Sequence, residues 1–157
     1  DWSVDQKEHP VMILIPGNQV TYREADKDFN RLNHFKVEEA GEKVAILALG
    51  DFYQRGEQLS AKIKAELGFT PTLINPRFAS GIDKELLESL SERHQMVITM
   101  EDGFGEKIAS FYGSSDMKVK NYGLDKKFYD RYDPNELLKE VGMTPVQIIA
   151  DICNQIK

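Results

Sequence analysis

Three short apolar runs, separated by segments with helical spacing, constrain the fold more than any other feature of this sequence. The runs are Val44–Leu49, Thr72–Ile74 and Met96–Met100. Each is short and nearly continuous in apolar residues, the pattern of a strand buried on both faces of its sheet. Since strands that alternate with helices are joined by crossovers, we predict an α/β fold whose parallel sheet is covered by helices on both faces.

The segments between the runs carry helix signals. Leucine and isoleucine recur at every fourth position through residues 59–67, and Gly68 follows as a stop signal. Asp83 is placed to cap a second helix. We also expect a helix over residues 104–112 and a short strand over residues 117–119.

Two more helices are predicted near the end of the chain, each opened by the same device. Asp133 and Thr144 are each followed by proline. Glu136 stands three residues after Asp133, and Gln147 stands three residues after Thr144. A capping side chain, a proline at the first helical position and Glu or Gln at the third can satisfy two backbone donors reciprocally. We therefore expect a reciprocal cap at both helix starts.

The last of these helices has an apolar stripe formed by Val146, Ile149, Ile152 and Ile156. Such a stripe is typical of core packing. Cys153, the single cysteine, stands among these isoleucines, so we expect a buried thiol; a reactive cysteine is the alternative.

The first part of the chain has a different character. The apolar run Val11–Ile15 is flanked by prolines and predicts a buried strand. Residues 21–42 are strongly charged and are interpreted as an extended linker or a peripheral helix, with a boundary near Gly41. Because the chain begins with Asp1 rather than Met, we expect it to be part of a longer protein.

Composition excludes several classes of function. The chain has 157 residues, of which 41% are hydrophobic, and this suits one globular domain with a flanking arm. Its formal net charge of -6 opposes the basic surface that nucleic acid requires. No apolar run approaches the roughly 20 residues of a membrane span, and no signal peptide is visible. We expect a cytoplasmic protein.

Ligands of parallel sheets gather at the carboxyl ends of strands, so the residues after the three runs are candidate site residues. Arg77 follows the second run, and Pro76 restricts the backbone just before it. A guanidinium held on a rigid turn suits recognition of a phosphate or carboxylate. The alternative is an arginine paired with a nearby acid such as Asp83 or Glu101.

Other chemistry-bearing residues support weaker hypotheses. Glu101 and Asp102 end the third run and could do acid or base work, although one inward, hydrogen-bonded carboxylate beside a solvated one explains them as well. Gly103 and Gly105 could bring amide donors to an anion. At a helix end, His94 is placed for an imidazolium favoured by the helix dipole. The sequence shows no cysteine and histidine cluster for a metal and no phosphate-binding P-loop.

Taken in order, these segments resemble a known family, the C-terminal domain of 1-deoxy-D-xylulose-5-phosphate synthases in the transketolase superfamily. The resemblance covers about residues 42–157, and residues 11–18 resemble the last strand of the pyrimidine-binding domain that precedes it. The segments that carry it are GEKVAILALG at 41–50, LINPRF at 73–78, VITMEDG at 97–103, YGL at 122–124 and VGMT at 141–144.

The resemblance implies a three-layer αβα domain with a mostly parallel five-stranded sheet. It implies that residues 1–20 end the preceding domain, residues 21–41 form a linker and residues 42–157 form the domain itself. Upstream domains of the same polypeptide would bind thiamine diphosphate and Mg²⁺ in a homodimer, whereas this part would bind no cofactor and contain no catalytic residue. Arg77 is the residue to which the resemblance gives a substrate role, holding the phosphate of the acceptor.

In that family, pyruvate loses carbon dioxide and the remaining two-carbon unit attacks glyceraldehyde 3-phosphate. The product of this reaction feeds isoprenoid and thiamine biosynthesis. Two departures bear on this implication. Leu14–Gly17 stand where the family has arg-tyr-pro-arg-gly, so neither family arginine has a counterpart. One lost charged contact costs about 1.5 to 3 kcal/mol, which leaves open a different acceptor, another basic residue such as Arg23, or a diverged non-catalytic interaction or regulatory domain. The loop at Gly103 is also shorter than in the family.

Overall fold

The computed structural model describes residues 2–15, 29, 31–101 and 103–156, in two compact units divided after Leu32. The first unit contains helix α1 (Trp2–Asp5). Its apolar run Val11–Ile15 forms neither helix nor strand, and all five side chains are exposed. The predicted buried strand is therefore wrong for these residues, because the described part of this unit provides no strand to pair with them. Residues 16–20 lie outside the described residues.

The second unit is built on a five-stranded sheet in the order β1-β3-β2-β4-β5. β1 runs antiparallel to β3, and the other three pairs are parallel. This confirms the predicted α/β class and the mostly parallel five-stranded sheet. The strands are β1 (Lys36–Glu39), β2 (Lys43–Ala48), β3 (Thr72–Asn75), β4 (His94–Met100) and β5 (Lys118–Tyr122).

β1 is a correction to the expected linker or peripheral helix over residues 21–42. Lys36 pairs with Asn75, so residues 36–39 of this segment are an edge strand of the sheet, while residues 21–28 and 30 lie outside the described residues. None of its four residues is fully buried, and even Val37 is exposed. An edge strand with solvated side chains does not need the apolar alternation by which strands are recognised, which is why the sequence pattern missed it.

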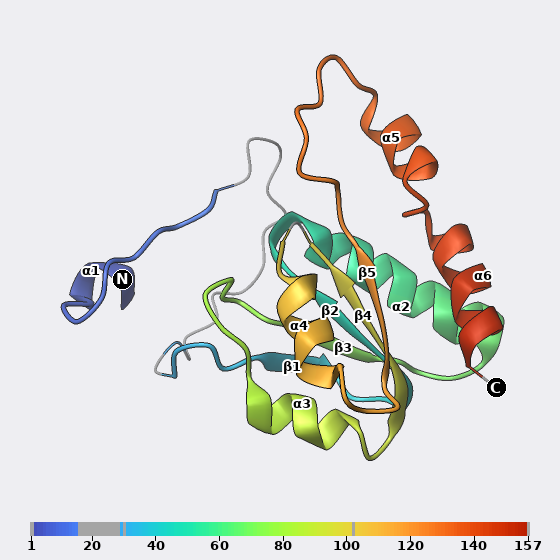
Figure 1. Ribbon diagram of the computed structural model, residues 1–157, viewed down its shortest axis with the longest axis horizontal. Coiled ribbons are helices and arrows are strands. Elements are labelled where there is room, and N and C mark those ends of the chain that lie inside the picture. The colour runs from blue at the N-terminus through green and yellow to red at the C-terminus, as the bar shows by residue number, and fades with distance from the viewer. Residues whose placement is uncertain (1, 16–28, 30, 102, 157) are drawn as a thin grey trace. The chain divides into compact units, whose positions relative to one another are not determined.

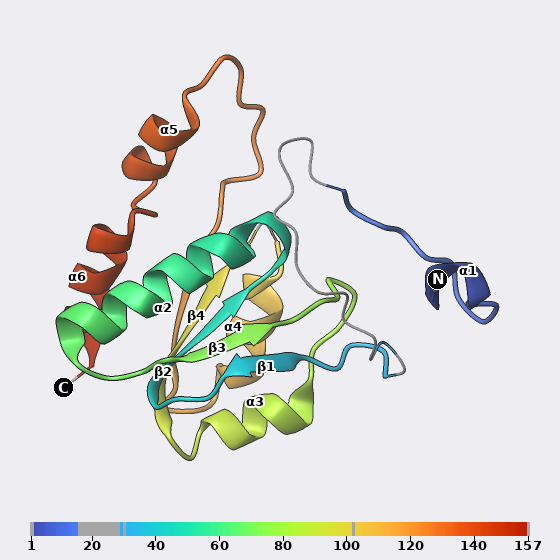
Figure 2. The same cartoon turned by 180° about the vertical axis from the view of Figure 1, so that it is seen from behind.

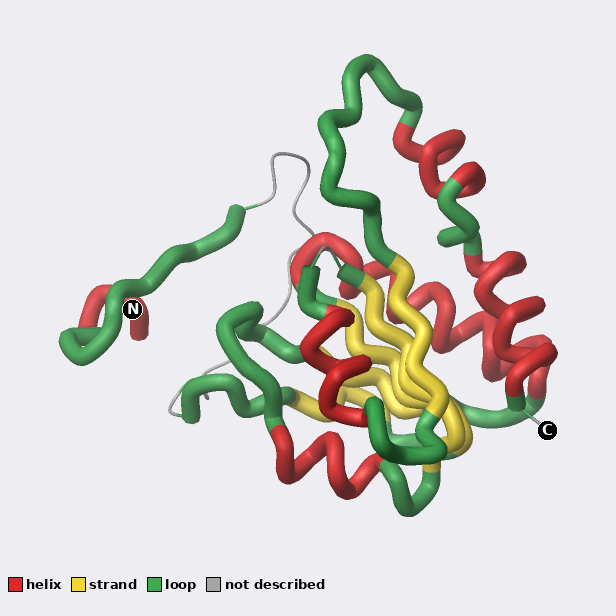
Figure 3. The backbone as a smooth tube through the Cα atoms, in the orientation of Figure 1, coloured by secondary structure: helices red, strands yellow, loops and turns green. Residues whose placement is uncertain are grey.

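Helices cover both faces of the sheet, as Figures 1 and 2 show from opposite sides. One face is covered by α2 and by the helices at the end of the chain, and the other by α3 and α4. The tube in Figure 3 shows that the loop after β5 runs away from the sheet before the chain returns in the last two helices. The helices are the 3-10 turn η1 (Gly50–Phe52), α2 (Tyr53–Leu67), α3 (Lys84–Leu90), α4 (Gly105–Tyr112), α5 (Pro134–Glu140) and α6 (Pro145–Gln155). No helix in the described parts of the chain has both the length and the apolar character needed to cross a membrane.

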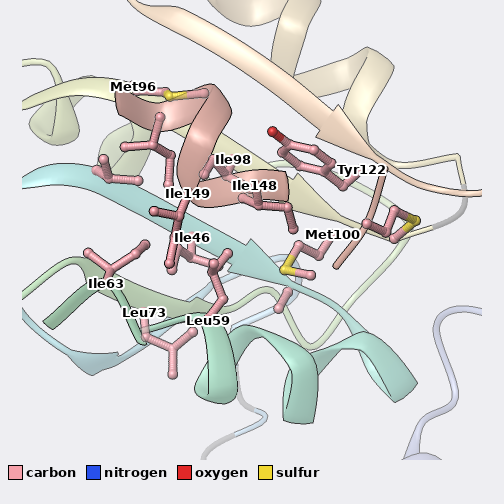
Figure 4. Packing of buried hydrophobic residues seen from close by; sticks show 14 of the residues in the cluster. Ile46, Leu59, Ile63, Leu73, Met96, Ile98, Met100, Tyr122, Ile148 and Ile149 are labelled. Atoms are coloured by element: carbon pink, nitrogen blue, oxygen red, sulfur yellow. The ribbon is translucent and has the colours of Figure 1, made fainter. Parts of the chain in front are cut away.

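Two apolar clusters, one on each face, hold these three layers together. On one face Ile46 and Ile98 pack against residues of α2 and α6, among them Ile63 and Ile148 (Figure 4). On the other face the alternate residues of the same strands, such as Leu47, pack against α3 and α4. Burial on both faces explains why β2, β3 and β4 appear as near-continuous apolar runs.

The predicted helix caps are largely confirmed. Asp83 accepts a hydrogen bond from the Leu86 amide, and Thr144 forms the full reciprocal box with Gln147. Asp133 accepts the amides of its own helix start, but the expected return bond from the Glu136 side chain is not formed among the described residues. That part of the prediction was therefore wrong. Glu136 is exposed, so its carboxylate can be solvated by water instead.

The stripe predicted on α6 is shifted around the helix. Ile148, Ile149 and Ile152 are buried, whereas Val146 is 63% exposed. Cys153 is also exposed, so the prediction of a buried thiol was wrong. Each helical residue turns about 100° from the one before, which carries Cys153 away from the face that Ile152 presents to the sheet.

Replacing Gly56 by valine should destabilise the protein, because α2 packs closely against the sheet at this glycine. A Cβ on Gly56 would lie 2.6 Å from the Ala48 Cβ and 3.3 Å from the Leu73 Cδ1. We expect Gly56→Val to lower the free energy of unfolding by about 1 to 3 kcal/mol, measured by urea denaturation. Ala61→Val, on the exposed side of the same helix, is the control. Equal losses in both variants would contradict the close approach.

Candidate functional site

The carboxyl ends of β2, β3, β4 and β5 meet at one edge of the sheet, because these strands are mutually parallel. Leu47 pairs with Ile74, and Met100 pairs with both Ala48 and Tyr122, so the strands end nearly level. The turns that follow β3 and β4 carry the sequence-predicted candidates. Two strand spacings, about 10 Å, separate those two strands.

Arg77 lies in a strained turn directly after β3. Its φ of 61° is in the left-handed region, which costs a non-glycine residue on the order of 1 kcal/mol or more. The Phe78 amide donates to the Pro76 carbonyl over 2.6 Å, closing a three-residue turn with Arg77 at its centre. The Arg77 amide donates to Asn75 Oδ1 over 3.0 Å, so the backbone is held at both ends of the turn.

The guanidinium of Arg77 is bound to the main chain of the segment that leads into β1. Its Nη2 and Nε both donate to the carbonyl oxygen of His34, over 2.7 Å and 3.2 Å. The side chain is half-buried, with its plane set by this two-pronged contact. The acids considered as alternative partners, Asp83 and Glu101, bind other groups described below.

Asp83 is buried and joins two elements through its two carboxylate oxygens. Oδ1 accepts the Leu86 amide over 3.1 Å and so caps α3. Oδ2 accepts the Phe35 amide over 2.9 Å and lies 2.8 Å from the Nδ1 of His34. The sequence indicated the cap alone. The contact with residues 34 and 35 spans nearly 50 positions of the chain and leaves no local pattern to find.

Glu101 is buried at the end of β4, where it caps α4. Its carboxylate accepts the amides of Phe104 and Gly105. This confirms the interpretation of an inward, hydrogen-bonded carboxylate, while Asp102 lies outside the described residues. The Gly105 amide, one of the donors considered for an external anion, is thus bound by the protein's own carboxylate.

His94 lies at the opposite, amino edge of the sheet and belongs to a chain of hydrogen bonds. Its Nδ1 is 2.9 Å from the Leu90 carbonyl oxygen and must donate to it, so in the neutral ring Nε2 accepts from the Thr72 hydroxyl over 2.8 Å. Thr72 Oγ1 in turn accepts the Gly41 amide. Burial lowers the pKa of His94, and the hydrogen bond to Leu90 opposes this only in part. The expected imidazolium is therefore wrong, and the neutral ring links structural elements.

The residues described provide no ligand set for a metal ion. Among them no group of three or more His, Cys, Asp and Glu side chains gathers at one place. A hollow of about 400 Å³ lies between α4 and the loop before α3, and it opens widely to solvent beside Lys107.

The sequence of this chain is similar to a known domain family and to curated proteins that contain it. Residues 33–148 match the family model described as "Transketolase, C-terminal domain". The chain is 31% identical to the 1-deoxy-D-xylulose-5-phosphate synthase of Shouchella clausii over 94% of the chain and 25% of that protein. It is 36% identical to the synthase of Clostridium perfringens over 69% of the chain and 18% of that protein. The chain thus spans about a quarter or less of the length of these relatives.

Solved structures share the fold. The protein titled "Split gene transketolase, inactive beta4 tetramer" superposes with a TM-score of 0.66 at 22% identity, over 78% of this chain and 42% of that one. The transketolase of Campylobacter jejuni superposes with a TM-score of 0.53 at 18% identity, over 78% of this chain and 18% of that one. At these identities the likeness concerns the fold.

Glu101→Gln should destabilise the protein, because an amide cannot accept at both of its heavy atoms. We expect the free energy of unfolding to fall by about 1 to 3 kcal/mol, since a buried backbone donor at the start of α4 loses its partner. Glu106→Gln, an exposed change of the same kind on the same helix, should alter the unfolding free energy by less than about 0.5 kcal/mol. If both variants unfold alike in urea, the capping role of Glu101 is wrong.

His94 should make stability depend on pH. Its pKa is lowered in the folded state, so the unfolded chain takes up a proton first as the pH falls through the unfolded value of 6.5. The contribution of the neutral ring is present above that value and is lost below it. We expect His94→Gln to flatten the decline of unfolding free energy between about pH 7.5 and pH 5.5, whereas His9→Gln, at an exposed position, should leave it unchanged. Parallel curves for all three proteins would contradict this.

Proposed function

The chain belongs to the transketolase C-terminal domain family, and we propose on that basis that it is the C-terminal part of a thiamine-diphosphate-dependent transferase. We propose further that this enzyme is a 1-deoxy-D-xylulose-5-phosphate synthase, which condenses pyruvate with glyceraldehyde 3-phosphate with loss of carbon dioxide. The synthases of Shouchella clausii and Clostridium perfringens, both similar to this chain, support the proposal. The enzyme would be a cytoplasmic homodimer, and Mg²⁺ would accompany the cofactor on other domains.

The observation that carries this proposal is the setting of Arg77. A guanidinium stands at the carboxyl edge of the sheet, on a strained turn whose backbone is held by hydrogen bonds. Strain of this kind is maintained where the surrounding structure enforces it, and it concentrates at ligand-binding positions. A fixed guanidinium can bind two oxygens of one phosphate, so the role proposed for Arg77 is to hold the phosphate of the acceptor.

The covalent chemistry belongs to thiamine diphosphate when it is bound by the other domains. The part that we propose for this chain is binding and orientation of substrate, with Arg77 as a cation fixed at the carboxyl edge of the sheet. A fixed cation lowers the entropy cost of bringing the acceptor aldehyde into reaction geometry, because the phosphate is anchored before the new bond forms.

One sequence observation favours a second candidate. Residues 14–17 lack both arginines that the family carries there, so part of the anion-binding charge is missing. A transketolase-type enzyme with a different acceptor, or a diverged interaction or regulatory domain without catalysis, would both accommodate this loss.

The test is the activity of the holoenzyme, the assembly that contains this chain with the thiamine-diphosphate-binding domains. Supplied with pyruvate, Mg²⁺ and cofactor, it should form product from glyceraldehyde 3-phosphate in preference to other aldehydes and sugar phosphates. Turnover of another acceptor would retain the transferase and replace the substrate. Intact cofactor binding without turnover of any acceptor would favour the non-catalytic candidate.

Arg77→Ala in the holoenzyme should raise the KM for glyceraldehyde 3-phosphate by about tenfold or more, because one charge-assisted contact is lost. Affinity for thiamine diphosphate should stay within about twofold, since the contact proposed for Arg77 is with the acceptor phosphate and not with the cofactor. Arg93→Ala, an exposed arginine next to the amino edge of the sheet, is the matched control. An unchanged acceptor KM in Arg77→Ala would refute the substrate role.

A further inference from the structure

The Arg77 guanidinium is anchored on one edge by a main-chain carbonyl group. Two N–H groups from one side of the guanidinium, on Nε and Nη2, converge on the oxygen of His34. Because the guanidinium is planar and rigid, the position of this oxygen sets both the direction and the tilt of the plane. Groups that hold the His34 carbonyl therefore help to hold this edge of the guanidinium.

The other end of the same peptide unit is held by Asp83. The peptide bond between His34 and Phe35 carries the His34 carbonyl and the Phe35 N–H on one rigid plane. Oδ2 of Asp83 accepts that N–H over 2.9 Å, while the carbonyl accepts from Arg77. A carboxylate at the N–H end also increases the partial negative charge on the carbonyl oxygen, which strengthens the bond to the guanidinium.

The imidazole of His34 provides a second hold on this unit. Its Nδ1 lies 2.8 Å from the same Oδ2 of Asp83, so side chain and main chain converge on one carboxylate oxygen. The Phe35 N–H is tied to Asp83 within the peptide plane, and the imidazole ties the His34 end of the unit to the same oxygen. Asp83 itself is buried and has its other oxygen fixed by the cap of α3, which makes it a stationary support.

We propose that Asp83 and His34 are positioning residues that orient Arg77 toward the phosphate of a phosphorylated aldehyde. This inference rests on the proposed function, and it deepens that function by naming the groups that align its anion-binding arginine. Asp83 and His34 do not touch substrate; they act through the peptide unit between His34 and Phe35.

The two oxygens of Asp83 allow the positioning role to be separated from the helix cap. Serine is a good N-cap and can still accept the Leu86 amide, but it offers one oxygen and is too short to reach the Phe35 amide as well. Asp83→Ser thus preserves the start of α3 and releases the peptide unit. In the holoenzyme, we expect it to raise the acceptor KM by about threefold to tenfold, with kcat and the pyruvate KM within about twofold.

The His34 side chain gives an independent pair of variants. His34→Ala removes the donor to Asp83, whereas His34→Asn keeps an N–H near the place of Nδ1. We expect His34→Ala to raise the acceptor KM and His34→Asn to restore it toward the parent value. The control is Ser80→Ala. Ser80 lies in the loop after Arg77 and donates a hydrogen bond to Asn33, so its removal leaves the peptide unit between His34 and Phe35 intact.

A double-variant cycle tests whether the effect passes through Arg77. In an Arg77→Ala background, Asp83→Ser should change the acceptor KM no further, because there is no guanidinium left to orient. An additional loss of the same size as in the parent enzyme would overturn the positioning role. An unchanged acceptor KM in both Asp83→Ser and His34→Ala would overturn it as well, and if Asp83→Ser does not fold, the His34 pair decides alone.

Failure of the proposed function is recognised separately. If Arg77→Ala leaves the acceptor KM unchanged, the substrate role of Arg77 is wrong. The alignment is then judged from crystal structures of the parent and Asp83→Ser proteins. A guanidinium that leaves the His34 oxygen in the variant supports control by Asp83, and one that stays within hydrogen-bond distance of it overturns that control.

Discussion

The architecture depends on the complete burial of β2 between two parallel neighbours and two layers of helices. Every residue from Val44 to Ala48 is fully inaccessible to solvent. A strand in that position must satisfy its backbone through β3 and β4 and its side chains through helices on both faces. The parallel connections of its neighbours then bring the turns after β2, β3 and β4 to the same edge, where the candidate site lies.

Two acids at this edge divide the work of fixing it. Glu101 binds backbone amides at the start of α4, so that helix start does not compete for a substrate anion. Asp83 binds the peptide unit whose carbonyl receives Arg77. Within the described residues, both carboxylates are occupied by backbone amides, and Arg77 is the cation that we propose to meet substrate.

The sequence predicted what local patterns encode and missed what long-range contacts encode. The buried runs, the helix stop at Gly68 and the cap at Asp83 were found because burial and capping leave periodic or positional signals. β1 was missed because a solvated edge strand has no apolar pattern, and Cys153 was misplaced because the phase of α6 is set by its neighbours. Arg77 was found from its place after a strand, but its link to His34 could not be, since it joins segments 43 positions apart.

The strained turn at Arg77 also bears on how such a chain evolves. At a φ of 61° the backbone favours glycine, and asparagine or aspartate are tolerated better than a long side chain. Glycine, asparagine or aspartate at this position would relieve the strain, but each would lose the hydrogen bonds that the guanidinium donates to the His34 oxygen. On the proposed function, the acceptor phosphate adds a second reason to keep arginine, so the residue at this single position would record whether a descendant retains the proposed anion site.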